Sequence, residues 1–128
     1  MKTFKEFQDF VKATAKGHDE KDTLPTYAAL GLAGECGEFV EMVKKAYRGD
    51  GPLDYVAAAS ELGDATWYIA RAAHKLGIPL QAIAEITEYK LTARKTLGKD
   101  HKREYSEMTK IILRLGGWED PDIDEGGS

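Results

Sequence analysis

Residues 25–76 read PTYAALGLAGECGEFVEMVKKAYRGDGPLDYVAAASELGDATWYIARAAHKL, and this segment decides the expected fold. Pro25 suits a helix start, and only glycines interrupt the helical pattern between it and Tyr47. The sequence GDGP at 49–52 is typical of a turn, and the Ala-rich stretch 53–76 follows it. Because this connection is short, we expect two long helices that pack antiparallel.

Three shorter helices are expected around this hairpin. Apolar residues recur at helical spacing, and the runs end at glycines, in 2–16, 79–97 and 101–115. The polar stretch 17–24 indicates a loop, with Thr23 as the expected cap of the next helix. No stretch has the sustained alternation of a strand. The sequence therefore predicts an all-α, four- to five-helix bundle, in which residues 1–115 form one domain.

The charge of the chain is concentrated at one end. The 128 residues carry 22 acidic and 18 basic side chains, a formal net charge of −4. Residues 116–128 hold five acidic and no basic side chains, which leaves 18 basic against 17 acidic residues in 1–115. Glycines and low apolar content predict that this acidic tail is disordered. The chain has no basic surplus of the kind that nucleic-acid binding requires, so we expect no nucleic-acid partner.

Cysteine content and hydropathy indicate the compartment. The single cysteine has no intrachain partner, which excludes a disulfide scaffold and favours a reducing environment. No apolar run reaches the roughly 18 residues that a membrane span needs, and charges interrupt the first apolar positions. We therefore expect a cytoplasmic protein without a membrane partner.

Two pairs of carboxylates lie in the two long predicted helices. Glu35 and Glu38 form one pair, and Glu61 and Asp64 form the other. Residues three apart lie on the same face of an α-helix, so each helix presents its pair in one direction. The pairs lie at matched distances from the turn at 49–52, and we expect them to meet at similar heights in the antiparallel hairpin.

Carboxylates that converge among apolar residues repel one another unless a cation neutralises them. Oxygen-only ligands suit a hard ion, Mg²⁺ or its substitute Mn²⁺. Neither motif has a histidine three residues after its first glutamate, which disfavours a di-iron bundle. The alternative is a solvated face, because single pairs with this spacing are common where charged side chains meet water. Gly34, Gly37 and Gly63 among the carboxylates are expected to permit tight helix packing.

Three segments together resemble a known family: 30–48 (LGLAGECGEFVEMVKKAYR), 61–70 (ELGDATWYIA) and 90–94 (KLTAR). They are similar to the MazG-type all-α nucleoside triphosphate pyrophosphohydrolases, and the resemblance covers residues 4–103. It implies a helical homodimer or homotetramer whose Mg²⁺ ligands here are Glu35, Glu38, Glu61 and Asp64. It also implies hydrolysis of a nucleoside triphosphate, expected to be a dNTP, to the monophosphate and pyrophosphate.

The resemblance also suggests substrate contacts. Lys90 and Arg94 match a Lys-Leu-x-x-x-Arg segment whose basic residues contact phosphates, and their i, i+4 spacing puts them on one helix face. Lys45 projects near the carboxylate face of its helix and is a third phosphate candidate. Trp67 and Tyr68 fall on or beside the carboxylate face of theirs, where they either stack on a base or belong to the core. The family's upstream asparagine is missing at 87–89, which leaves base preference open.

The expected mechanism assigns Glu38 or Glu35 as the group that deprotonates the attacking water, with Glu38 preferred because it lies nearer the basic face. His18, His74 and His101 have no partner at metal-ligand spacing and are expected at the surface. Cys36 is expected to be a small buried filler. The alternative function is a non-catalytic helical nucleotide-binding or regulatory module.

Overall fold

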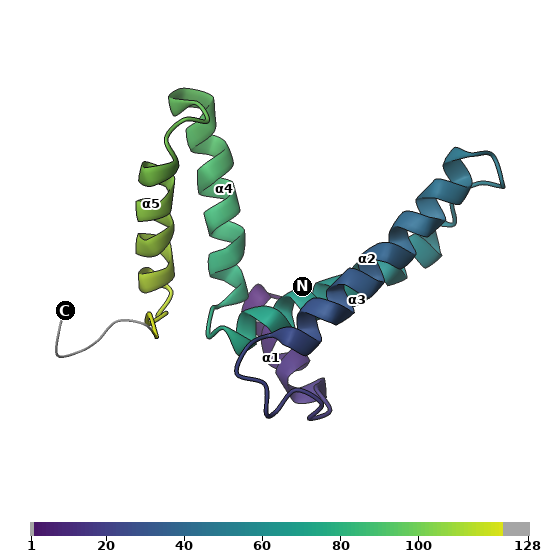
Figure 1. The fold of residues 1–128 in the computed structure, drawn as a ribbon, viewed down its shortest axis with the longest axis horizontal. Helices are drawn as coiled ribbons and strands as arrows, with labels where there is room; N and C mark the ends of the chain where they lie inside the picture. The colour runs from purple at the N-terminus through teal and green to yellow at the C-terminus, as the bar shows by residue number, and fades with distance from the viewer. Residues whose placement is uncertain (1, 122–128) are drawn as a thin grey trace.

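The computed structural model describes residues 2–121, in which every regular element is an α-helix (Figure 1). The helices are α1 (Phe4–Thr14), α2 (Thr26–Tyr47), α3 (Tyr55–Lys75), α4 (Leu80–Leu97) and α5 (Lys102–Leu115). The all-α prediction is confirmed, with no strand among the described residues. The disorder predicted for the acidic tail falls largely on 122–128, which lie outside those residues.

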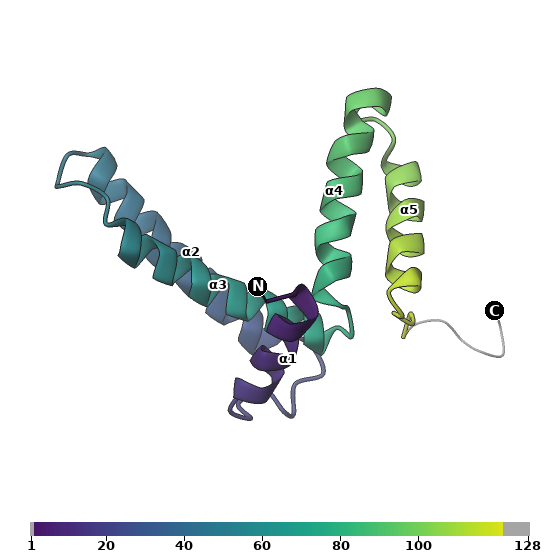
Figure 2. The ribbon, with the colours of Figure 1, turned by 180° about the vertical axis from the view of Figure 1, so that it is seen from behind.

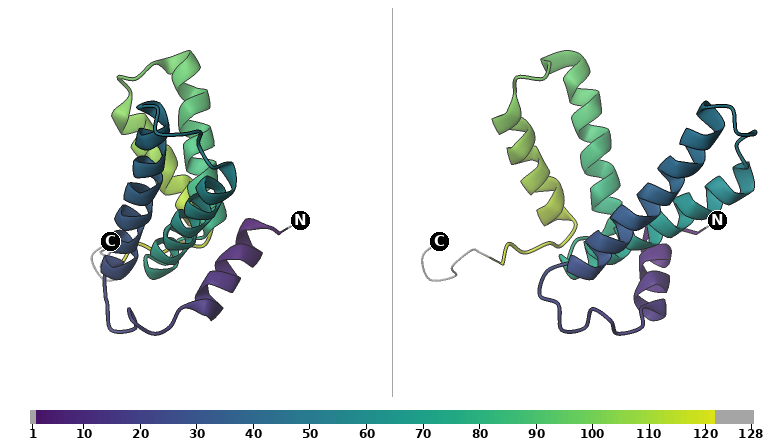
Figure 3. Two further views of the ribbon diagram at one scale, coloured as in Figure 1. Left: turned by 90° about the vertical axis from the view of Figure 1, so that its right-hand side faces the viewer. Right: turned by 45° about the vertical axis from the view of Figure 1, so that its right-hand side comes forward.

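The helices form two hairpins joined at one end. Helices α2 and α3 pack antiparallel along their length, as the sequence predicts, and α4 and α5 form a second pair (Figures 1 and 2). Helix α1 lies where the two pairs meet and contacts α3 and α4. The two hairpins diverge from this junction (Figure 3). Among the described residues, α4 contacts α1, α3 and α5 but not α2.

The small core lies at this junction. Val11 of α1 is fully buried and clusters with Ala70 of α3 and Leu80 of α4, while Phe7 and Trp67 pack against the cluster. Burial of these apolar groups removes them from water and holds the three helices together. The core therefore fixes the end of the hairpin from which α3 leads into α4.

One polar side chain reinforces the junction. Gln8 Nε2 donates to the carbonyl of Ile78 at 2.9 Å, and Gln8 Oε1 accepts from the backbone N–H of Leu80 at 2.8 Å. Helix α4 begins after Pro79 and has no cap from its own neighbouring side chains. Gln8 of α1 thus satisfies one of the free N–H groups that every helix start leaves.

Two sequence predictions about single residues are wrong. Thr23 does not cap α2, because the cap position is Pro25 and makes no side-chain hydrogen bond. The Asp22 carboxylate accepts instead from the backbone N–H of Tyr27, at 3.4 Å. Cys36 is exposed and not buried, because it lies about 100° around α2 from Glu35, beside the face that packs on α3.

The glycines do not act as predicted either. A Cβ placed on Gly34, Gly37 or Gly63 would meet nothing within 4 Å, so these residues face open space and do not permit close packing of α2 on α3. Gly31 has that role. A Cβ there would lie 2.2 Å from the ring of Tyr68, so the absence of a side chain lets this ring lie against the backbone of α2.

Large apolar side chains are exposed on the outer surface of the α2–α3 hairpin. Tyr47 is 91% exposed, Val56 83%, Tyr55 80% and Leu30 70%. Exposed apolar side chains of this size are candidates for contact with another protein surface. No helix among residues 2–121 is both long and apolar enough to cross a membrane.

Candidate metal centre and adjoining pocket

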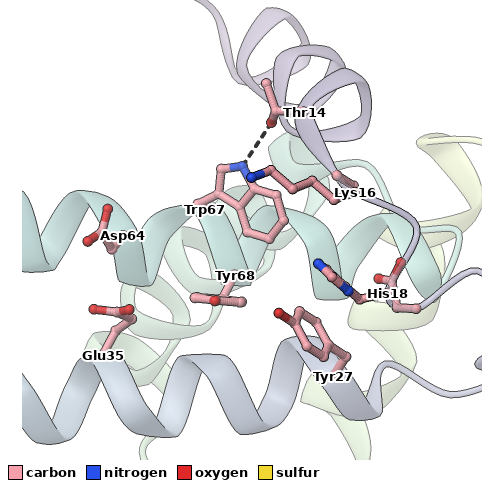
Figure 4. A pocket seen from close by; sticks show the side chains of 10 residues that line it. Thr14, Lys16, His18, Tyr27, Glu35, Asp64, Trp67 and Tyr68 are labelled. Carbon is pink, nitrogen blue, oxygen red and sulfur yellow. Dashed lines mark hydrogen bonds between the residues drawn. The ribbon is translucent and has the colours of Figure 1, made fainter.

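Three of the four predicted ligands lie together. Glu35 and Glu38 of α2 and Glu61 of α3 each offer a carboxylate oxygen, and these three oxygens lie within 4.8 Å of one another. The i, i+3 spacing within α2 and the antiparallel packing on α3 produce this arrangement, as the matched distances from the turn predict. Asp64, one turn further along α3, faces an adjoining pocket together with Glu35 (Figure 4).

Two carboxylate oxygens of this cluster have no hydrogen-bond partner among the described residues. Glu35 Oε2 and Glu61 Oε2 are buried and accept no hydrogen bond from the described residues. Hydrogen bonding with Glu61 and then its like charge raise the pKa of Glu38 above its ordinary value. The pKa of Glu61 is raised as well, chiefly by Glu35. Buried carboxylate oxygens without a donor are costly, and an all-oxygen set of side chains of this kind could hold a hard ion such as Mg²⁺ or Mn²⁺.

A pocket of about 430 Å³ adjoins the cluster. It is lined by Thr14, Ala15, Lys16, His18, Asp19, Tyr27, Glu35, Asp64, Trp67 and Tyr68. Figure 4 shows the carboxylates of Glu35 and Asp64 at one end, Trp67 and Tyr27 on opposite sides, and His18 at the other end. The pocket therefore joins an acidic end to an aromatic end.

The aromatic rings hold one another in place. The ring centroids of Trp67 and Tyr68 lie 5.1 Å apart in an edge-to-face contact, and those of Tyr27 and Tyr68 lie 6.4 Å apart. His18 stacks on Tyr27 with centroids 5.5 Å apart. Burial, followed by the nearby Tyr27 hydroxyl, raises the pKa of Tyr68. A preorganised set of rings of this kind offers stacking faces to a flat ligand.

Trp67 belongs to both the core and the pocket. One side of the indole packs against the Val11 cluster, and Nε1 donates to Thr14 Oγ1 at 3.0 Å. The other side lines the pocket (Figure 4). The two interpretations that the sequence leaves open for this residue, core or binding site, are thus compatible.

The structure does not bring the three predicted phosphate contacts to this pocket. Lys45 lies on α2 about 10 Å along the helix from Glu38, on the rise of 1.5 Å per residue. Lys90 and Arg94 lie on α4, which does not contact α2 within the described part of the chain. The Arg94 guanidinium lies 5.8 Å from the ring centroid of Tyr105 on α5. None of the three lines the pocket of this protomer.

Sequence reasoning missed the six residues of the pocket that come from α1, the α1–α2 connection and the start of α2: Thr14, Ala15, Lys16, His18, Asp19 and Tyr27. Tyr27 could have been found, because it precedes Gly31 and Glu35 by steps of four along one face of α2. Lys16 and His18 lie in an irregular connection that carries no periodic signal. Their place in the site depends on contacts between residues far apart in the chain.

Comparisons with known proteins identify a relative. No family model matches the chain, and no solved structure matches it. It is similar to the Gene 37 protein of Mycobacterium phage L5, with 36% identity over 77 residues that span 57% of this chain and 68% of that protein. The name of that protein states no biochemical activity. At this identity and coverage, the chain belongs to the family of the phage L5 Gene 37 protein.

Proposed function

We propose that this protein is a Mg²⁺-dependent nucleoside triphosphate pyrophosphohydrolase of the MazG-like type. The observation that carries the proposal is the cluster of Glu35, Glu38 and Glu61, whose oxygens lie within 4.8 Å of one another at the edge of an aromatic pocket. Two of these carboxylates have a buried oxygen without a partner, which supports a cation there. An acidic cluster beside stacking faces suits a ligand with both a polyphosphate and a base.

The proposed reaction adds water across the α–β phosphoanhydride bond of the nucleotide and releases the monophosphate and pyrophosphate. Mg²⁺ held by Glu35, Glu38, Glu61 and Asp64 would neutralise phosphate charge and acidify water. Glu38 is the carboxylate proposed to accept the proton of the attacking water, with Glu35 as the second candidate.

The aromatic end of the pocket is proposed to hold the base of the nucleotide, expected to be a dNTP. Trp67 and Tyr27 face each other across the pocket and could stack on a base, with Tyr68 between them and the carboxylates (Figure 4). In the assembly proposed below, Lys45, Lys90 and Arg94 retain the phosphate-binding role that the family resemblance implies.

We further propose a homodimer or homotetramer in the cytoplasm. Support for assembly comes from the apolar side chains that α2 and α3 expose, which a second copy would cover. A second copy also gives a route by which the basic residues of α4 could reach phosphates bound to another protomer. Support for the compartment is the single free cysteine.

One observation favours the alternative, a nucleotide-binding or regulatory module without turnover. Lys45, Lys90 and Arg94 do not line the pocket of the protomer, so the groups expected to stabilise a leaving pyrophosphate are missing from it. The two functions differ in turnover alone. A module would bind nucleotide with Mg²⁺ and release no product.

Pyrophosphate release from a panel of NTPs and dNTPs, with and without Mg²⁺, tests the proposal. We expect release that needs Mg²⁺ and that Glu38→Gln abolishes while the helical circular dichroism signal persists. Glu41→Gln is the matched control, because Glu41 lies one turn further along α2 and pairs with Lys44 at 2.9 Å, outside the cluster. If no nucleotide releases pyrophosphate, the enzyme proposal is wrong, and binding without turnover would favour the module.

A further inference from the structure

The connection between α1 and α2, residues 15–25, forms one wall of the pocket, and a single buried residue attaches it to α3. Asp19 is 4% exposed, although its neighbours His18 and Glu20 are exposed. The side chain of Asp19 accepts two hydrogen bonds from Arg71 of α3, from Nε at 2.7 Å and from Nη2 at 2.6 Å. Its backbone carbonyl accepts a third from Lys75 Nζ at 2.5 Å.

The ion pair of Asp19 and Arg71 is more buried than the other ion pairs described here. Arg71 is 7% exposed, whereas every other Lys or Arg ion pair of the described residues has side chains about half exposed or more. Burying two charges is costly unless the geometry is good, and the two parallel bonds of an arginine fork supply that geometry. The hydrogen bonds from Arg71 lower the pKa of Asp19, which keeps its carboxylate ionised.

The α1–α2 connection also contacts Tyr27 at the start of α2, through the Asp22 carboxylate, which accepts from its N–H at 3.4 Å, and through the His18 ring stacked on its ring. Leu24, the one large apolar side chain of the connection, is 65% exposed. Its internal hydrogen bonds, Glu20 N–H to Gly17 carbonyl at 3.4 Å and Asp22 N–H to Asp19 carbonyl at 3.0 Å, shape the turn without attaching it to a helix. The bonds to Arg71 and Lys75 attach it to α3, so they determine where the connection lies.

The residues next to Asp19 in sequence reach the pocket. His18 is adjacent to Asp19, and Lys16 precedes it by three residues, so fixing Asp19 restricts both to within about 11 Å along the chain. Both line the pocket, and Figure 4 shows the His18 ring turned toward Tyr27 and Tyr68. Lys16 is the one lysine or arginine among the described residues that line it.

We propose that Asp19 and Arg71 are positioning residues for nucleotide binding, because their buried pair holds Lys16 and His18 against the pocket. This inference rests on the proposed function for the identity of the ligand. Lys16 then supplies a positive charge to the bound nucleotide, and His18, stacked on Tyr27, extends the aromatic wall. The carboxylate cluster lies on α2 and α3 and does not depend on the pair.

The test is Arg71→Lys, which keeps the buried charge and loses the fork. The nucleotide is the one that the unmodified protein hydrolyses fastest. We expect KM to rise about tenfold, equivalent to about 1.4 kcal/mol, with kcat changed less than about threefold. Affinity for Mn²⁺ alone, measured by electron paramagnetic resonance, should not change. Arg48→Lys is the matched control, because Arg48 pairs with Asp50 at the exposed far end of the hairpin.

Two further measurements separate positioning from general stability. In a Lys16→Gln/His18→Ala background, Arg71→Lys should no longer raise KM, because the residues through which it acts are gone. In a Trp118→Phe background, Trp67 is the remaining tryptophan of the two, and acrylamide should quench it more strongly after Arg71→Lys. This quenching needs no nucleotide, so it tests attachment of the connection even if the proposed activity fails.

The inference is wrong if Arg71→Lys leaves both KM and Trp67 quenching unchanged. It is equally wrong if kcat and Mn²⁺ affinity fall while KM rises, which would indicate a merely structural role. Should Arg71→Lys not fold, Asp19→Asn is measured by the same criteria, since asparagine keeps the shape and one acceptor of the native side chain. If the protein hydrolyses no nucleotide but Arg71→Lys still increases the quenching of Trp67, the proposed function is wrong. The attachment of the connection by Asp19 and Arg71 would still be supported.

Discussion

Replacing Gly31 with alanine tests how the pocket is built. The new Cβ would lie 2.2 Å from Tyr68 Cε1 and 2.5 Å from Cδ1 and Cζ. Carbon atoms pack at about 3.5–4.0 Å, so the ring would have to retreat by more than about 1 Å. Retreat is restricted, because the ring lies against Trp67 on one side and Tyr27 on another.

Two opposing effects set the change in the free energy of unfolding that Gly31→Ala causes. Overpacking of this kind costs about 1–3 kcal/mol. Alanine in place of glycine within a helix stabilises by about 1 kcal/mol. Gly31→Ala should therefore lower the free energy of unfolding by about 0–2 kcal/mol. Gly34→Ala is the matched control one turn along α2, where a Cβ meets nothing, and it should raise that free energy by up to about 1 kcal/mol in the protomer.

Urea unfolding followed by circular dichroism measures both effects at one fixed protein concentration, because the proposed assembly would make stability depend on concentration. Adding Tyr68→Ala removes the ring, so Gly31→Ala should become stabilising in that background. The coupling between the two sites should equal the overpacking cost, about 1–3 kcal/mol. Equal stabilisation by Gly31→Ala in both backgrounds would refute the contact. In the proposed enzyme, Gly31→Ala should also weaken nucleotide binding.

Four further predictions concern stability. Without divalent ions, the melting temperature should fall relative to that of Glu38→Gln as pH rises above the ordinary glutamate pKa of 4.5, because the folded-state pKa of Glu38 is raised and its protonated form favours the fold; the comparison removes the opposite contribution of His74, whose pKa burial lowers. Mg²⁺ should remove this fall, and a thermal scan across pH with Mg²⁺ or EDTA checks both statements. Glu38→Gln should stabilise the metal-free protein near pH 7 and reduce the stabilisation by Mg²⁺, measured by differential scanning calorimetry; an unchanged response to Mg²⁺ would contradict the proposed centre. Val11→Ala should cost about 2–3 kcal/mol in urea unfolding, since it removes two buried methyl groups and leaves a cavity; a loss below about 1 kcal/mol would show that the site collapses. Thr3→Ala removes the capping box of α1 and should lower the free energy of unfolding by about 1 kcal/mol. Thr92→Ala, at an exposed position within α4, is the control and should not lower it.

Local patterns in the sequence predict the helices and the carboxylate cluster. Helical periodicity, glycine stops and the GDGP turn locate α2 and α3, and the i, i+3 spacing then determines which carboxylates face one another. These features depend on residues close in the chain, so no tertiary information is needed. The register of the hairpin follows from the length of the turn.

The wall of the pocket depends on contacts between distant residues, which spacing does not reveal. Asp19 and Arg71 lie 52 residues apart, and they meet only because α1 docks on the α2–α3 hairpin. The sequence does not reveal that Gly31 makes room for the ring of Tyr68, because this role depends on which side chain packs against the glycine. Gly34 and Gly37 look identical to it in sequence and face open space.

Gln8 has a consequence for the order in which the chain assembles. Its amide bonds to Ile78 and Leu80, some 70 residues later, and these bonds help to set the direction in which α4 leaves the junction. During synthesis α1 emerges first, but it cannot make these contacts until α4 has begun to appear. Gln8 can therefore orient the second hairpin only once the start of α4 is present, and a Gln8→Ala chain should form its helices normally but lose this docking more readily, with faster unfolding.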